Sequence, residues 1–167
     1  MNRITNLPTT EEIQGTDADH HLHPFSDIKE LNKKGAKVIT RGKGIYLYDN
    51  NGRKYLDAMS GLWCVNIGYG RPELAKIAAE QMLELPYYNT FFGTTHPPVV
   101  KLAKKISELS PKNLNKVFFA SSGSEANDTN IRLVRHFWSV MGTPSKKVII
   151  SRHNAYHGSS VGSASLG

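Results

Sequence analysis

Several features that would narrow the function are scarce in this sequence. Among its 167 residues there is one cysteine, Cys64, so no internal disulfide can form. No apolar run approaches the roughly 20 residues that a membrane span needs, and the opening stretch MNRITNLPTTEEIQGTDADHH lacks the apolar core of a signal peptide. We therefore expect a soluble, cytoplasmic protein with no membrane partner, in which Cys64 is a small buried residue.

The sequence carries more positive than negative charge, but the basic residues are not concentrated in one segment. The formal net charge is +7, which raises the question of a nucleic acid or another polyanion as partner. The basic residues are spread as pairs, without a basic run and without interleaved aromatic residues: Lys33-Lys34, Lys104-Lys105 and Lys146-Lys147. This distribution is typical of solvated faces, and we predict no nucleic-acid partner.

Residues 1–24 are polar, show no sustained hydrophobic periodicity and end in DADHHLHP. We interpret them as an N-terminal arm. His20, His21 and His23 lie close together in the sequence, but no cysteine and no second histidine cluster accompanies them. We therefore predict no metal site.

The stretch 37–58, KVITRGKGIYLYDNNGRKYLDA, alternates short β-branched and aromatic runs with turn residues. Asn51-Gly52 supplies the positive φ that tight hairpin turns require. The pattern predicts a small antiparallel meander, which we assign to a domain over residues 25–58. Several glycines in MSGLWCVNIGYG then lead into a second domain over 59–167.

The second domain is predicted to contain helices and parallel strands. RPELAKIAAEQMLEL and PPVVKLAKKISEL repeat apolar residues at helical spacing behind a proline. The apolar run KVFFA, a helix through Trp138 and a second run KKVII follow in turn. A strand, a helix and a strand at these lengths predict a βαβ unit of a parallel sheet, so the fold class is α/β.

The junction between the first predicted strand and its helix carries the cluster SSGSEAND. Ligands of open parallel sheets bind where helices follow the carboxyl ends of strands, and the first amides of a helix bind phosphate. Ser122, Gly123, Ser124 and Glu125 also match a capping box, which begins many helices that bind nothing. No lysine stands where a Walker A loop needs one, and the cluster is not a G-x-S-x-G elbow.

The second predicted strand ends in a similar loop, RHNAYHGSSVGS. Two neighbouring strands would bring both loops to one edge, and the second loop adds Tyr156 and His157. An aromatic ring and an imidazole beside a phosphate site suit a planar, phosphorylated, heteroaromatic cofactor.

The combination of SSGSEAND, NAYHGSS, GLWCVNIGYG and YYNTFFGTTHP resembles the class III aminotransferases, which are pyridoxal-phosphate enzymes of fold type I. It is most similar to the branch that transfers amino groups from ω-amino acids or amines to pyruvate. The resemblance covers residues 23–167. It implies the N-terminal part of that fold, with an arm, a small meander and the start of the large cofactor-binding domain.

The resemblance also implies roles for single residues. Ser122, Gly123 and Ser124 match the motif that holds the phosphate of pyridoxal 5′-phosphate. Tyr156 matches the aromatic residue that stacks on the pyridine ring, with His157 beside it.

Substrate contacts follow in the same way. Trp63 matches an aromatic residue of the substrate pocket, and Phe25 resembles a pocket residue supplied by the arm. Phe91 and Phe92 lie in the segment that reaches toward the other subunit's active site, so a homodimer is expected, with an amine and a keto acid as small-molecule partners.

No catalytic residue is assigned. In the family, the lysine that bonds covalently to the cofactor lies beyond the position of Gly167, so we expect this chain alone to be inactive. Two alternatives stay open: a non-catalytic phosphate-binding or interaction fragment of the same fold, and a nucleotide-binding protein unrelated to transamination. Binding of pyridoxal 5′-phosphate would distinguish the nucleotide-binding alternative, which should not bind it, from the other interpretations.

Overall fold

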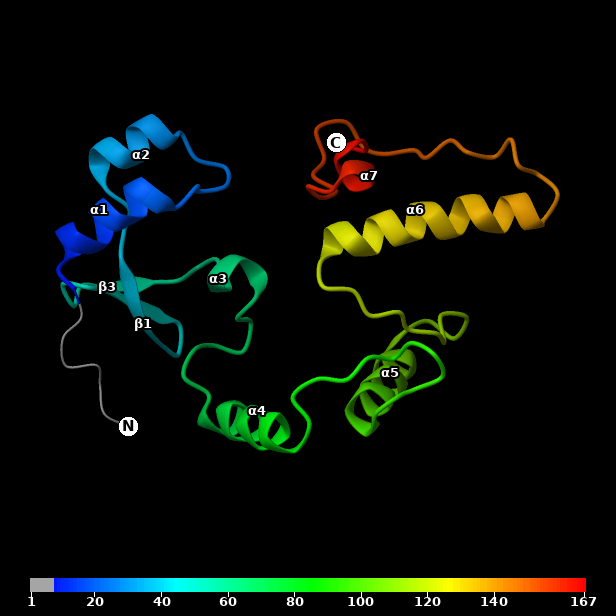
Figure 1. The fold of residues 1–167 in the computed structure, drawn as a ribbon, viewed down its shortest axis with the longest axis horizontal. Coiled ribbons are helices and arrows are strands. Elements are labelled where there is room, and N and C mark those ends of the chain that lie inside the picture. The colour runs from blue at the N-terminus through cyan, green and yellow to red at the C-terminus, as the bar shows by residue number, and fades with distance from the viewer. Residues whose placement is uncertain (1–7) are drawn as a thin grey trace. The chain divides into compact units, whose positions relative to one another are not determined.

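The structure is a computed structural model that describes residues 8–167, and the chain divides after Tyr87 into two compact units. The elements of the first unit are α1 (Thr10–His20), α2 (Ile28–Lys34), β1 (Ile39–Lys43), β2 (Tyr46–Asp49), β3 (Lys54–Leu56), α3 (Ser60–Trp63) and α4 (Pro72–Glu84) (Figure 1). Those of the second are α5 (Pro97–Leu109), α6 (Gly123–Val140) and α7 (Val161–Ala164). The predicted domain limits, 1–24, 25–58 and 59–167, stay a prediction.

The first unit contains the predicted antiparallel meander, with strand order β1-β2-β3. The turn between β2 and β3 forms where the sequence predicts it, because Gly52 has a φ of +80°. Asp49 fixes this turn: its Oδ1 atom accepts hydrogen bonds from the N–H groups of Asn51 and Arg53, at 3.0 and 2.9 Å. The meander is therefore specified by local turn chemistry.

Helix α1 is a feature that the sequence analysis missed. Its N-cap Thr9 accepts a hydrogen bond from the N–H of Glu12, while the Glu12 carboxylate accepts one from the N–H of Thr9. The segment lacks an apolar face, and this capping box is the local feature that stabilises the start of the helix. Gln14 then ties α1 to the chain after α2, since its Nε2 atom donates to the carbonyl oxygen of Ala36 at 2.7 Å.

The three long helices form where the apolar spacing predicts them. Proline occupies the first turn of α4 and of α5, and Ser122 is the N-cap of α6. No apolar side chain is buried among the described residues, and the one fully buried side chain is that of Ser163. The apolar faces of these helices therefore lie open along the described chain.

Two predicted strands do not form. The stretches 116–120 and 146–150 carry no strand in the structure, so the predicted βαβ unit is wrong for this chain by itself. A strand exists through hydrogen bonds to a neighbouring strand, and within residues 8–167 neither stretch has one. Both stretches are apolar, but the described chain contains no other strand with which they could form a parallel sheet.

Two further findings concern the exposure of Cys64 and the search for membrane-spanning helices. Cys64 is exposed, so the prediction that it is buried is wrong. Helices long and apolar enough to cross a bilayer do not occur within residues 8–167.

Candidate functional site

The start of α6 combines a helix cap with uncapped amides. The Ser122 hydroxyl oxygen accepts a hydrogen bond from the Glu125 N–H at 3.1 Å. The Glu125 carboxylate reaches back to the N–H of Ser121, at 2.7 Å. The capping interpretation of the cluster is thus confirmed, with Ser121 in place of Ser122 as the donor to Glu125.

This cap leaves the backbone N–H groups of Gly123 and Ser124 without an acceptor among the described residues. A Cβ atom added at Gly123 would meet nothing within 4 Å, so a ligand can approach the backbone there. Unpaired N–H groups at the positive end of a helix dipole bind anions. Capping and anion binding are therefore compatible at this helix.

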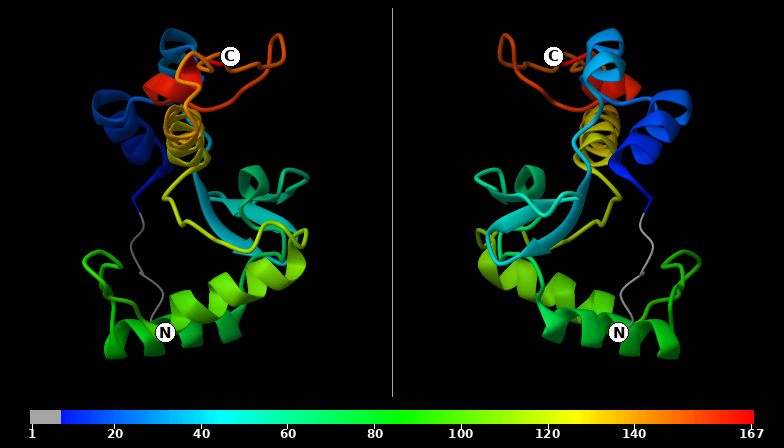
Figure 2. Two further views of the ribbon diagram at one scale, coloured as in Figure 1. Left: turned by 90° about the vertical axis from the view of Figure 1, so that its right-hand side faces the viewer. Right: turned by 90° about the vertical axis from the view of Figure 1, so that its left-hand side faces the viewer.

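The loop after residue 150 is held against the start of α6. The Ser124 hydroxyl oxygen accepts a hydrogen bond from the Ser159 N–H at 3.0 Å. Asn127, one turn along the helix, donates from Nδ2 to the carbonyl oxygen of His157 at 2.6 Å. Figure 1 shows α7, which follows this loop, beside the first turns of α6, and Figure 2 shows the same two helices in a view along α6. The structure thus brings the two predicted loops together without the predicted parallel sheet.

Asn127 and Asp128 are residues whose part in this arrangement the sequence analysis missed. Asp128 accepts a hydrogen bond on Oδ1 from the N–H of Ser163, at 2.7 Å, and so holds α7. Both belong to the SSGSEAND cluster and lie three and four residues after Ser124. That spacing places them on the same helix face as Ser124, which is the signal that could have found them.

Close packing makes glycine necessary at position 158. Its φ is +140°, and an added Cβ atom would lie 2.3 Å from the Ser163 hydroxyl oxygen and 2.7 Å from that of Ser124. Beside it, the Nε2 atom of His157 is buried without a hydrogen-bond partner among the described residues. The Tyr156 ring is largely exposed. The loop therefore holds a buried polar atom without a hydrogen-bond partner and a largely exposed aromatic ring.

The predicted pocket aromatics are highly exposed, and three of the four have unusual backbone. Among the described non-glycine residues, φ is positive at Phe25, Ser60, Leu62, Trp63, Phe92 and Asn154. This left-handed conformation costs about 1–2 kcal/mol per residue, and such residues gather at functional sites. Phe91 lacks this feature. Phe25 and Trp63 belong to the first unit and Phe91 and Phe92 to the second, and their sharing of one pocket stays a prediction.

The left-handed turn that carries Trp63 is held by Asp57. The Oδ2 atom of Asp57 accepts hydrogen bonds from the Gly61 N–H and from the Tyr69 hydroxyl, each at 2.7 Å. The hydrogen bond from Tyr69 is the largest cause that lowers the pKa of Asp57 below its ordinary value, and it raises the pKa of Tyr69. The Asp57 carboxylate thus stabilises the turn that positions Trp63.

A cavity of about 540 Å³ lies along the flank of α6. Its lining comprises Phe118, Phe119, Ala120, Ser121, Glu125, Asp128 and Thr129. It includes none of the predicted cofactor residues. With two carboxylates on its wall, it is a poor place for a phosphate, so the amides of Gly123 and Ser124 remain the better anion site.

Comparison with known proteins identifies the family of this chain. Residues 30–167 match the family described as Aminotransferase class-III. The chain belongs to the class III aminotransferases. The resemblance inferred from the sequence motifs is therefore confirmed, and with it the α/β fold type I class of which this chain forms the N-terminal part.

Individual relatives agree with this assignment. The chain is 58% identical over 165 residues to the putrescine–pyruvate aminotransferase of Pseudomonas aeruginosa, covering 99% of this chain and 36% of the relative. An (S)-enantioselective ω-transaminase of Thermomicrobium roseum superposes with a TM-score of 0.92 at 41% identity, covering 96% of this chain and 36% of that one.

A solved structure with a ligand is also similar. The ω-transaminase of Pseudomonas jessenii in complex with PMP gives a TM-score of 0.89 at 42% identity, covering 92% of this chain and 34% of that one. The chain spans about a third of the length of the relatives that it matches.

Proposed function

We propose that this chain supplies the phosphate site and part of the substrate pocket of an aminotransferase that moves an amino group from an amine or ω-amino acid to a keto acid such as pyruvate. The family assignment supports the reaction class. The relative from Pseudomonas aeruginosa, named for putrescine and pyruvate, supports the substrates. The observation that carries the proposal is the pair of unpaired amides at Gly123 and Ser124, held beside the loop of Tyr156 and His157.

The chain's residues fit pyridoxal 5′-phosphate. The N–H groups of Gly123 and Ser124 would donate to its phosphate, together with the Ser124 hydroxyl, which accepts from Ser159 and keeps its own hydrogen to donate. Ser122 holds the helix start in place. Tyr156 would cover one ring face, and the unpaired Nε2 atom of His157 is available beside it. When bound, this cofactor supplies the electron-poor ring that makes transamination possible.

The aromatic residues of the chain favour a substrate with an apolar part. Phe25, Trp63, Phe91 and Phe92 would line the amine side of the pocket, where aromatic walls accept apolar groups and exclude water. Phe91 and Phe92 also fit a homodimer, because both side chains are mostly exposed here, at 70% and 99%. Their covering by a second subunit would bury area that is now open to water.

The phosphate site is tested by comparing pyridoxamine 5′-phosphate with pyridoxamine, since neither forms the imines that an aldehyde forms with surface lysines. We expect the phosphorylated compound to bind this chain at least about tenfold more tightly, because charge-assisted hydrogen bonds contribute about 1.5–3 kcal/mol. Inorganic phosphate should compete. Equal binding of the two compounds, or binding of neither, would contradict the proposal that this chain holds the phosphate.

A further inference from the structure

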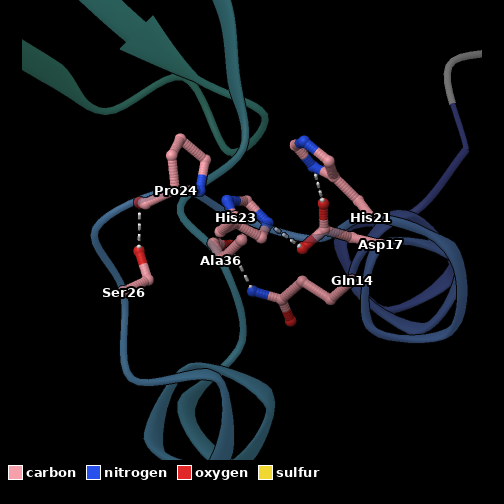
Figure 3. Close-up of polar contacts among 7 residues, drawn as sticks. All are labelled: Gln14, Asp17, His21, His23, Pro24, Ser26 and Ala36. Carbon is pink, nitrogen blue, oxygen red and sulfur yellow. Dashed lines mark hydrogen bonds and ion pairs between the residues drawn. The ribbon is translucent and has the colours of Figure 1, made fainter. Parts of the chain in front are cut away.

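Asp17, His21 and His23 form a cluster that the proposed function does not use. Asp17 lies on α1, His21 is the C-cap of that helix, and His23 follows two residues later. The Nδ1 atom of His21 lies 2.9 Å from Oδ1 of Asp17, and the Nε2 atom of His23 lies 2.8 Å from Oδ2 (Figure 3). The two imidazoles thus reach one carboxylate from different positions along the chain.

The spacing of these atoms fits a metal ion. One ligand atom from each of the three residues lies within 4.8 Å of the others. Bonds of about 2.0–2.1 Å to a four-coordinate zinc ion place neighbouring ligand atoms roughly 3.3 Å apart. The two observed nitrogen–oxygen separations, each to a different oxygen of Asp17, are shorter than this, so the carboxylate must turn and the ligands must open to admit an ion. Two imidazoles and a carboxylate are also the donor set that Zn²⁺ and similar divalent transition metals accept.

The local fold holds the three residues in place. The turn from α1 into α2 contains Pro24, which fixes its own backbone, and the Ser26 hydroxyl donates to the Pro24 carbonyl oxygen at 3.0 Å. On the other side, the bond between Gln14 and Ala36 anchors α1 (Figure 3). Preorganised ligands lower the cost of ordering that metal binding imposes.

The cluster is also accessible. The side chains of Asp17 and His23 are 19% and 23% exposed and that of His21 is 59% exposed. Asp17 and His21 line a hollow of about 870 Å³ along α1, through which an ion with its remaining water ligands can enter. The sequence alone predicted no metal because the histidines had no companion ligand, and the structure supplies that companion in Asp17.

We propose that Asp17, His21 and His23 bind a divalent transition metal of the Zn²⁺ class. The ion takes one oxygen from Asp17 and one nitrogen from each histidine, and water completes its coordination. The site lies two residues before Phe25, so the metal fixes the segment that carries this predicted pocket residue.

The test is a calorimetric titration of the untagged chain with Zn²⁺. We expect one ion per chain, and at least about tenfold weaker binding for Asp17→Asn and for His23→Asn, since even outer-shell partners of a metal contribute that much. His20→Asn is the matched control, because His20 neighbours His21 on the chain but lies outside the cluster. This variant should bind as the unsubstituted chain does.

A second readout does not depend on the variants' folding. In the unsubstituted chain, Zn²⁺ should shift the imidazole NMR signals of His21 and His23 and leave that of His20 unchanged. The proposal is overturned if no stoichiometric Zn²⁺ binding occurs, if His20→Asn weakens binding as much as His23→Asn, or if the His20 signal shifts equally. The cluster would then be a hydrogen-bonded helix end only.

Discussion

The hydroxyl oxygen of Ser124 accepts a hydrogen bond from the backbone N–H of Ser159 at 3.0 Å, across 35 residues of sequence. This bond joins the start of α6 to the loop that carries Tyr156 and His157. It turns two separate Gly/Ser-rich segments into one candidate site. Ser124 therefore has two roles. Its hydroxyl oxygen holds the loop, and its N–H and hydroxyl hydrogen are free to donate to an anion.

Replacing Ser124 should weaken cofactor binding more than replacing Ser121. We expect Ser124→Ala to lower the affinity for pyridoxamine 5′-phosphate about tenfold, because a charge-assisted hydrogen bond and the tie to Ser159 are both lost. Ser121→Ala is the matched control, since the Ser121 N–H already donates to Glu125 and the Ser121 hydroxyl makes no hydrogen bond within residues 8–167. Fluorescence titration of the two variants checks this, and equal, small effects would leave the start of α6 with a capping role alone.

Gly158→Ala should disrupt the loop. The new methyl group would lie 2.3 Å from the Ser163 hydroxyl oxygen, so the loop must move away from α6. Gly142→Ala is the control, because Gly142 also has a positive φ, of 77°, but an added Cβ atom there meets nothing within 4 Å. We expect faster amide hydrogen exchange over residues 154–160 in Gly158→Ala only. Exchange over residues 154–160 that is as slow in Gly158→Ala as in Gly142→Ala would contradict the need for glycine at position 158.

Acid should loosen the turn that positions Trp63. Because the folded-state pKa of Asp57 is lowered, its contribution to stability is present above its unfolded pKa, near 3.9, and is lost as the pH falls through the folded value. Tyr69→Phe removes the largest cause of the lowering, so the pKa of Asp57 should rise toward its ordinary value. NMR titration of the Asp57 carboxyl carbon measures this. Tyr55→Phe, which removes a hydrogen bond to Asp49 instead, should leave it unchanged.

Trp63→Ala should change amine preference without changing cofactor binding. The Trp63 side chain is 75% exposed and packs into no core here, so its loss costs little stability. In a transaminating polypeptide that contains this chain, we expect larger amines to gain in kcat/KM relative to small ones. The cofactor's absorbance should stay the same. A variant that fails to fold would assign Trp63 to the core of the complete enzyme.

The chain by itself should self-associate. Along α5, Val100, Leu102 and Leu109 are at least half exposed, and no apolar side chain is buried in the described residues. Uncovered apolar faces of this kind drive association. Size-exclusion chromatography with light scattering should show dimers or larger species and no amine–pyruvate turnover. A monodisperse monomer with a cooperative thermal transition would contradict this expectation.

The sequence predicted elements whose signals are local. Pro72 and Pro97 mark the first turns of two helices, Ser122 marks the cap of a third, and Asn51-Gly52 marks a hairpin turn. The strands at 116–120 and 146–150 could not be decided in this way, because a strand depends on partners elsewhere. Helix α1 has no apolar periodicity that would predict it, and its local signal is the capping box formed by Thr9 and Glu12.

The candidate site shows the same division. The motif around Ser124 indicated an anion site, and the class III resemblance assigned its cofactor. The contacts of Asp17 with His21 and His23 could not be predicted from the sequence, because they depend on how the chain turns after α1. The left-handed turn at Trp63 depends likewise on Asp57, six residues earlier.

The unpaired amides at the start of α6 are the proposed site of the cofactor's phosphate. Two-dimensional ¹H–¹⁵N NMR of the labelled chain, titrated with pyridoxamine 5′-phosphate, reports on each of these amides separately. We expect large shifts of the Gly123 and Ser124 amide signals, while the Ser121 amide, held by Glu125, changes little. Unchanged Gly123 and Ser124 signals at saturating ligand would contradict this proposal.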